Sequence, residues 1–244
     1  MLPIIKHPGA WGKCKGCQWE KKLAAGRKYA IILSIMGLAL PGGAPPPRGN
    51  RPPHIPEKSR YQPIELKEEM VSQQTVYEGI IVNVRRDKAR LLDGRIANRE
   101  VVEHPGGVAV FAMDGQGRVA LVRQFRYPLG EVTLELPAGK LEPGEDPRAS
   151  GLRELAEETG LTPGTFLPLG SIASSPGILA ERIHLFFARD LVQGEARPDD
   201  GEFVETLWVP YQDLLDMARR GEIQDGKTLA GILKASFLLE APQT

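Results

Sequence analysis

Cysteines, aromatic residues, net charge and long apolar runs are all scarce in this chain. Its 244 residues include two cysteines and 6% aromatic residues, and the formal net charge is zero. Two cysteines are too few for a disulfide-rich secreted scaffold, and a neutral composition lacks the basic excess of nucleic-acid binders. The apolar run at residues 29–40 has 12 residues, whereas a membrane-spanning helix needs about 20. We therefore expect a cytoplasmic protein without a nucleic-acid or membrane partner.

The zero net charge conceals a division of the chain near residue 60. Residues 1–60 carry a net charge of +9 and 9 of the 21 prolines, whereas the remaining 184 residues carry −9. Proline-rich, charged segments stay extended because they cannot form a packed core. We predict that residues 1–60 are a disordered basic extension, followed by an N-terminal strand region at 61–104 and a main domain at 105–244.

Two features inside the extension carry weak signals. Cys14 and Cys17 form a single CxxC motif, which without a second pair or histidines at ligand spacing is a weak indication of zinc. The apolar run at 29–40 resembles the core of a signal peptide, although the segment before it is unusually long. Neither feature gives the extension a defined role.

From residue 74 onward, β-rich segments alternate with turn residues. Asp93-Gly94 and the segment 114–117 have the composition of hairpin turns. We predict strands at 75–84, 88–92, 96–103, 107–113, 118–125, 131–136, 183–188 and 203–209, and helices at 147–159, 210–219 and 228–239. Strands interleaved with helices are typical of an α/β or α+β domain.

The helix predicted at 147–159 has clear start and stop signals. Asp146 is a good N-cap because its carboxylate accepts hydrogen bonds from free backbone N–H groups. Pro147 follows at the first helical position, where a missing N–H is tolerated. Gly160 suits the left-handed residue that closes a helix. Gly151 lies inside the helix, where glycine costs about 1 kcal/mol relative to alanine, so we expect a neighbouring backbone to approach it closely.

The same helix has an apolar face and an acidic face. The apolar face follows the i, i+3, i+4, i+7 rule and consists of Leu152, Leu155, Ala156 and Thr159. Glu154, Glu157 and Glu158 lie at i, i+3 and i+4 on a different face, where like charges repel one another. A divalent hard cation such as Mg²⁺ would remove that repulsion, because it binds carboxylate oxygens and substrate phosphates.

These residues belong to a longer pattern. It places Gly139, five residues, Glu145, seven residues and then the segment 153–161, which reads RELAEETGL. The pattern matches every fixed position of the Nudix box, so the chain resembles the Nudix hydrolase family. The resemblance implies an α/β fold, an α/β/α sandwich around a mixed sheet, here with an N-terminal antiparallel strand region. It also implies hydrolysis of a nucleoside diphosphate linked to another moiety, with Mg²⁺, or Mn²⁺, as the cofactor.

The resemblance assigns roles around the metal. The metal ligands would be the backbone carbonyl of Ala138 and the carboxylates of Glu154, Glu157 and Glu158, with Gly139 letting the loop bend close to the ions. The catalytic set would consist of Glu157, Arg153, Glu145 and a general base. Arg153 and Glu145 would act by bracing the loop against the helix.

The general base is expected on a late acidic loop. We choose Glu202 in the segment 199–202, with Glu205 as the alternative. A solvated acidic loop without a catalytic role remains the competing interpretation.

Flanking segments are similar to the ADP-ribose pyrophosphatase branch of the family. They are residues 123–126 (RQFR), 135–139 (ELPAG) and 174–177 (SSPG), in which Pro176 follows Leu161 by 15 residues. By this resemblance Arg126 contacts the diphosphate, because an arginine fork suits phosphate. The alternative is a surface arginine at the end of a strand. Pro176 is assigned to the substrate site.

The resemblance also predicts a homodimer in which the strands of residues 61–104 cross to the partner. Tyr77, Arg99 and Glu100 would then bind the adenosine end of the substrate. Ordinary strand packing is the alternative role for Tyr77.

The substrate is a small nucleotide sugar on this interpretation. The leading hypothesis is Mg²⁺-dependent hydrolysis of ADP-ribose to AMP and ribose 5-phosphate. One alternative is a pyrophosphatase for another nucleotide sugar, such as ADP-glucose or GDP-mannose. The other is a non-catalytic module that senses a nucleotide, but such modules usually lose a glutamate of the box, and all of them are present here.

Overall fold

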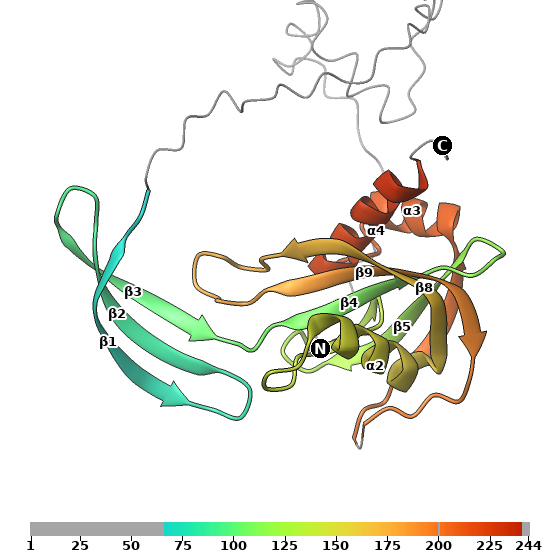
Figure 1. Cartoon of the computed structure of the whole chain (residues 1–244), viewed down its shortest axis with the longest axis horizontal. Coiled ribbons are helices and arrows are strands. Elements are labelled where there is room, and N and C mark those ends of the chain that lie inside the picture. Colours follow the sequence, from blue (N-terminus) through green and yellow to red (C-terminus); the bar gives the residue numbers. More distant parts are fainter. Residues whose placement is uncertain (1–65, 200, 241–244) are drawn as a thin grey trace, which may run out of the picture. The chain divides into compact units, whose positions relative to one another are not determined.

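The computed structural model describes residues 66–199 and 201–240. The predictions made for the basic extension at 1–60, with its CxxC motif and apolar run, lie outside these residues. The elements are β1 (Glu69–Glu78), β2 (Asn83–Arg90), β3 (Ile96–Glu103), β4 (Gly107–Ala112), β5 (Arg118–Arg126), β6 (Glu131–Glu135), β7 (Ala138–Lys140), α2 (Pro147–Thr159), β8 (Leu161–Ile172), β9 (Ile183–Gln193), β10 (Glu205–Pro210), α3 (Tyr211–Arg220) and α4 (Gly226–Leu239) (Figure 1).

The strands form three sheets. An antiparallel N-terminal sheet has the order β1-β2-β3, a second sheet has the order β10-β5-β6, and a third has the order β7-β4-β9-β8. In the third sheet β4 and β9 run parallel, while β7 and β8 pair antiparallel with their neighbours. The predicted mixed sheet and the antiparallel N-terminal strand region are therefore confirmed.

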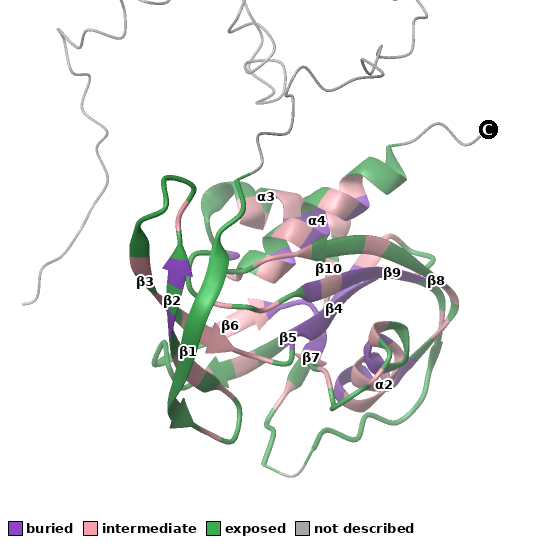
Figure 2. Cartoon of the chain, turned by 60° about the vertical axis from the view of Figure 1, so that its left-hand side comes forward, coloured by how far each residue is buried: buried purple, intermediate pink, exposed green. Residues whose placement is uncertain are grey.

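Strand β4 separates two apolar cores. Its side chains alternate between the two faces of the sheet, as in any strand. Val108 and Val110 pack in one core with Leu155 of α2, whereas Phe111 packs in the other with Leu214 of α3 and residues of α4. Figure 2 shows the buried central strands lying between α2 and the α3–α4 pair. Helices thus cover both faces of the sheet, which is the α/β/α arrangement expected from the sequence.

Helix α2 begins and ends at the predicted residues. The Asp146 carboxylate accepts hydrogen bonds from the backbone N–H groups of Arg148 and Ala149 at 3.0 and 3.1 Å. Gly160 closes the helix with a left-handed φ of 72°. These caps satisfy backbone groups that the helix leaves free at its two ends.

The buried face of α2 is rotated from the one predicted. Leu155 and Thr159 are buried, but Leu152 and Ala156 are only partly so, and Glu158 is buried with them. Gly151 is also buried, yet aromatic rings and not a backbone approach it: a Cβ there would lie 3.0 Å from the Phe166 ring. Phe166 stacks on Phe186 beneath the helix, with ring centroids 4.7 Å apart.

The prediction of one strand at 75–84 was wrong. That segment contains the end of β1, a turn and the start of β2. The Gly79 N–H donates to the Val82 carbonyl at 3.0 Å and to the Asn83 side chain at 3.3 Å. A side chain on Gly79 would collide with the Tyr77 ring, so the glycine permits the turn. The apolar composition of this segment concealed it.

Strand β8 was not predicted. Its 12 residues contain Pro163, Gly164, Pro168 and Gly170, which read as loop residues. The strand lies at the edge of its sheet, paired only with β9. Proline is tolerated there because an edge strand has N–H groups that need no ladder partner.

No helix in the described ranges is long and apolar enough to cross a membrane.

Candidate active site

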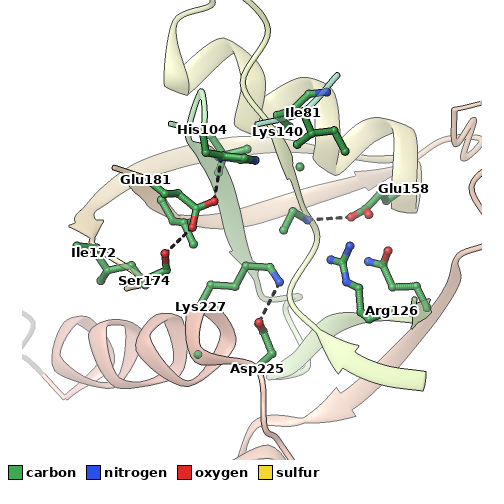
Figure 3. Close-up of a pocket in the computed structure, with 18 of the residues that line it drawn as sticks. Ile81, His104, Arg126, Lys140, Glu158, Ile172, Ser174, Glu181, Asp225 and Lys227 are labelled. Carbon is green, nitrogen blue, oxygen red and sulfur yellow. Dashed lines mark hydrogen bonds and ion pairs between the residues drawn. The ribbon is translucent and has the colours of Figure 1, made fainter. Parts of the chain in front are cut away.

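A cavity of about 740 Å³ opens where β7, β5, α2 and the start of α4 meet (Figure 3). Five residues singled out from the sequence line it: Ala138, Gly139, Glu158, Arg126 and Glu202. They come from β7, α2, β5 and the loop before β10. The fold therefore brings together parts of the chain that are up to 76 residues apart in the sequence, from Arg126 to Glu202.

Glu158 is the most buried carboxylate of the box, with 4% of its surface exposed. Its Oε2 accepts a hydrogen bond from the Ala138 N–H at 2.8 Å. Burial, together with the negative charges of Glu154 and Glu202, raises the pKa of Glu158 to about 8, although the Ala138 N–H acts in the opposite direction. Burial likewise raises the pKa of Glu154, and the charges of Glu157 and Glu202 add to the effect.

Arg153 holds the other box carboxylates in place. Its guanidinium donates two hydrogen bonds to Glu145, at 2.9 and 3.0 Å. One nitrogen, Nη1, also donates to Glu154 at 2.8 Å and to Glu157 at 2.9 Å. Hydrogen bonds from Arg153 and from the Glu142 N–H lower the pKa of Glu145 to about 2. These contacts join Glu145 of the loop to Arg153 of α2, and the bracing role itself stays a prediction.

Gly139 leaves room for Glu154 against the backbone of β7. A Cβ at Gly139 would lie 2.0 Å from the carboxyl carbon of Glu154. Any larger residue would therefore push that carboxylate away. The glycine acts here through this close approach of a side chain, since its φ is not in the left-handed region.

The carboxylates fit a divalent cation in charge and in ligand type. The charges of Glu157 and Glu202 contribute to the raised pKa of Glu154, and those of Glu154 and Glu202 contribute to the raised pKa of Glu158. Oxygen ligands such as these suit a hard cation. Within residues 66–199 and 201–240, however, no three acidic, histidine or cysteine side chains already converge on one point. Arg153 lies between Glu154 and Glu157 and binds both. A cation would take over part of the neutralisation that Arg153 provides.

The two candidates for the general base lie in different places. Glu202 lines the 740 Å³ cavity, and its charge acts on Glu154 and Glu158. Glu205 is on β10, pairs with Arg123 and does not line that cavity. The geometry favours Glu202 over Glu205.

Arg126 lines the cavity and is bound to a carboxylate that the sequence analysis did not single out. Its guanidinium donates to Glu135 at 2.7 and 2.6 Å. Lys227, at the start of α4, pairs with the same carboxylate and also lines the cavity. Lys227 lies 92 residues from Glu135, so no local sequence pattern predicts the contact between them.

A second polar group on the cavity wall was also missed. Glu181 accepts a hydrogen bond from the Ser174 hydroxyl at 2.5 Å, and its other oxygen lies 3.1 Å from His104 Nδ1. Figure 3 shows this group on the opposite side of the cavity from Arg126 and Glu158. Ser174 belonged to the segment used for the family resemblance, whereas His104 and Glu181 carried no motif.

The residues predicted for adenosine, and Pro176 of the predicted substrate site, do not line this cavity. Arg99, Glu100 and Pro176 line a separate cavity of about 410 Å³ between the N-terminal sheet and residues 176–180. Arg99 is paired there with Glu68 at 2.6 Å. Tyr77 lines neither of the two cavities and is 58% exposed on β1.

The two cavities share one segment of the chain. Ser174 and Glu181 face the larger cavity, and residues 176–180 face the smaller one. Two backbone hydrogen bonds join this segment to β3, from Val102 N–H to Ile178 at 2.8 Å and from Ala180 N–H to Val102 at 2.9 Å.

Comparisons with known proteins identify two family domains in the chain. Residues 103–231 match the NUDIX domain, and residues 68–102 match the nucleoside diphosphate sugar hydrolase N-terminal domain. An ADP-ribose pyrophosphatase of Bacillus subtilis (strain 168) is 37% identical over 169 residues, which cover 68% of this chain and 91% of that protein.

Two further proteins extend the comparison. A GDP-mannose pyrophosphatase of Escherichia coli O139:H28 is 32% identical over 173 residues, covering 65% of this chain and 89% of that protein. A crystal structure of an ADP compounds hydrolase superposes with a TM-score of 0.64 at 18% identity, over 71% of this chain and 95% of that one. The box carboxylates and Arg153 thus lie in a matching domain on a matching fold, and the chain belongs to the Nudix family of hydrolases.

Proposed function

We propose that this protein hydrolyses the diphosphate bond of ADP-ribose to give AMP and ribose 5-phosphate, with Mg²⁺ as the cofactor. The observation that carries the proposal is the 740 Å³ cavity, because one space joins the buried box carboxylate Glu158, the cation Arg126 and the loop carboxylate Glu202. The ADP-ribose pyrophosphatase from B. subtilis supports the choice of substrate.

Each group on the cavity wall has a task in this reaction. The box glutamates and the Ala138 carbonyl would hold a divalent cation, which would supply neutralisation of the diphosphate charge. Glu202 accepts a proton from the attacking water, whose oxygen forms a new bond to one phosphorus. The bridging P–O bond breaks, and the second phosphate leaves with the electron pair. Arg126 and Lys227 offset the negative charge that shifts among the phosphate oxygens.

The opposite wall suits the sugar. His104 and Ser174 both present hydrogen-bonding groups around Glu181, at 3.1 and 2.5 Å from its carboxylate oxygens. Sugar hydroxyls need such partners when they leave water. The GDP-mannose pyrophosphatase relative makes a hexose nucleotide the alternative substrate. A non-catalytic sensing role is disfavoured by the complete set of box glutamates.

The predicted homodimer is part of the proposal. Strand β1 is exposed along its whole length, including Met70, Val76 and Tyr77. An exposed edge strand with apolar side chains invites pairing with another chain. In a dimer Tyr77 could reach a partner's adenosine end, as the family resemblance implies. The cytoplasmic location and the absence of a nucleic-acid partner stay predictions.

A substrate comparison tests the proposal. The purified full chain is incubated with Mg²⁺ and equal concentrations of ADP-ribose, ADP-glucose and GDP-mannose, and the products are separated by chromatography. We expect AMP and ribose 5-phosphate in equal amounts, with the highest kcat/KM for ADP-ribose. A higher kcat/KM for a hexose nucleotide would show that ADP-ribose is not the preferred substrate. If no nucleoside monophosphate were released from any of the three, the proposal that the protein is a pyrophosphatase would be wrong.

A further inference from the structure

Glu135 is a buried carboxylate with no role in the reaction proposed above. It ends strand β6, and 1% of its surface is exposed. Burying an ionised carboxylate is strongly unfavourable unless cations and hydrogen bonds compensate for it. The groups that compensate the charge of Glu135 therefore indicate its function.

Three groups from three elements converge on Glu135. Arg126 of β5 donates through Nε and Nη2, at 2.7 and 2.6 Å. The Thr133 hydroxyl donates to Oε1 at 2.5 Å, and the Lys227 ammonium pairs with Oε2. Burial alone would raise the pKa of Glu135, but the bonds from Arg126 and the charge of Lys227 lower it to about 2.

The same contacts leave each cation with donors to spare. Among the described residues Arg126 makes hydrogen bonds only through Nε and Nη2, so Nη1 stays available. Lys227 is shared between Glu135 and Asp225, the latter at 3.1 Å, and an ammonium has three protons. Both side chains line the 740 Å³ cavity, and Figure 3 shows the Arg126 guanidinium and the Lys227 ammonium directed into it.

We propose that Glu135 is a positioning residue: it holds Arg126 and Lys227 together as a two-cation cradle for the diphosphate of the substrate. This inference rests on the proposed function, since it needs a ligand with two adjacent phosphates. Two cations at one carboxylate would otherwise repel each other, and long side chains would lose rotamer freedom on binding. The shared carboxylate offsets the repulsion between the two cations and fixes their side chains before the substrate binds. The site is therefore preorganised.

A double-variant background separates positioning from a structural role. The kcat/KM for ADP-ribose is measured for Glu135→Gln in the full chain and again in an Arg126→Ala/Lys227→Ala background. If Glu135 acts through the two cations, we expect a loss of about 30-fold or more in the first case and of less than about 2-fold in the second. A structural role predicts equal losses in both backgrounds.

Binding of inorganic pyrophosphate gives a readout that does not depend on turnover. Calorimetry without metal should show an increase of at least about tenfold in Kd on Glu135→Gln. The matched control is Asp114→Asn, which also breaks a carboxylate–arginine pair, with Arg118 at 2.7 Å, but away from the cavity. That control should leave the Kd unchanged.

Should Glu135→Gln fail to fold, Thr133→Val removes a single donor to Glu135 Oε1. It should lower kcat/KM by a few-fold, and only while Arg126 and Lys227 are present. Unchanged pyrophosphate binding, or equal losses in both backgrounds, would overturn the cradle. A wild-type chain whose pyrophosphate binding depends on Glu135, but which hydrolyses no nucleotide sugar, would support the cradle and refute the proposed function.

Discussion

At the scale of single residues, Gly139 controls the position of Glu154. A Cβ at Gly139 would lie 2.0 Å from the Glu154 carboxyl carbon, so Gly139→Ala must displace a proposed metal ligand. We expect kcat for ADP-ribose to fall at least about tenfold, which corresponds to about 1.4 kcal/mol of barrier, with little change in Tm. Gly115→Ala is the matched control, because a Cβ there meets nothing within 4 Å. Equal activity of the two variants would show that Gly139 does not control the position of Glu154.

Glu145 makes stability depend on pH in a defined direction. Its pKa is lowered to about 2 in the folded chain, first by the hydrogen bond from Arg153, whereas the ordinary value is 4.5. The stabilisation is therefore present above pH 4.5 and is lost as the pH falls toward about 2. Thermal unfolding should show Glu145→Gln to be less stable than wild type at pH 6, with the difference shrinking below pH 4. A Tm difference that is constant from pH 6 to pH 3 would contradict this linkage.

At the scale of elements, α2 depends on its N-cap. Asp146 accepts from two free N–H groups, and replacing such a cap by alanine costs about 1 kcal/mol. Asp146→Ala should lower the free energy of unfolding by that amount in urea titrations. Asp213→Ala is the control, because Asp213 lies in the first turn of α3, a helix without a side-chain cap bond. An equal decrease in the free energy of unfolding in both variants would show that the loss of a negative charge, and not the loss of the N-cap hydrogen bonds, destabilises the protein.

The elements differ in how well local sequence specifies them. Helix α2 was predicted to the residue because Asp146, Pro147 and Gly160 each act on the chain next to them. Strand β8 was missed because its prolines are acceptable only at a sheet edge, and edge position is a property of the whole sheet. The turn at Gly79 was missed because apolar residues surround it on both sides.

The site was predictable where a motif carried it. The box pattern located Glu154, Glu157, Glu158, Arg153 and Glu145, all within residues 145–158. The Glu135–Lys227 pair spans 92 residues, and the contact between His104 and Glu181 joins the loop before β4 to the loop before β9. Contacts of this kind arise from the fold. They cannot be predicted from the periodicity or the motif spacing of a single sequence.

At the scale of the whole molecule, the state of assembly should decide adenosine binding. Tyr77 is 58% exposed and lines neither the 740 Å³ nor the 410 Å³ cavity, so we expect it to contact substrate from a partner. We expect light scattering to show a dimer, and Tyr77→Ala to raise KM more than it lowers kcat, since stacking of a base on an aromatic ring is worth about 1–3 kcal/mol. A fully active monomer with wild-type kinetics for Tyr77→Ala would contradict both expectations.

The most direct measurement is the release of AMP from ADP-ribose by the full chain and by its Glu157→Gln/Glu158→Gln variant, each with Mg²⁺ and with EDTA. We expect AMP release by the wild type with Mg²⁺ only, and a kcat for the variant that is lower by about 10²–10⁴-fold, or roughly 3–5 kcal/mol of barrier. Circular dichroism should show both proteins folded. Mg²⁺-dependent turnover that is unchanged in the double variant would contradict the assignment of the chemistry to the box glutamates.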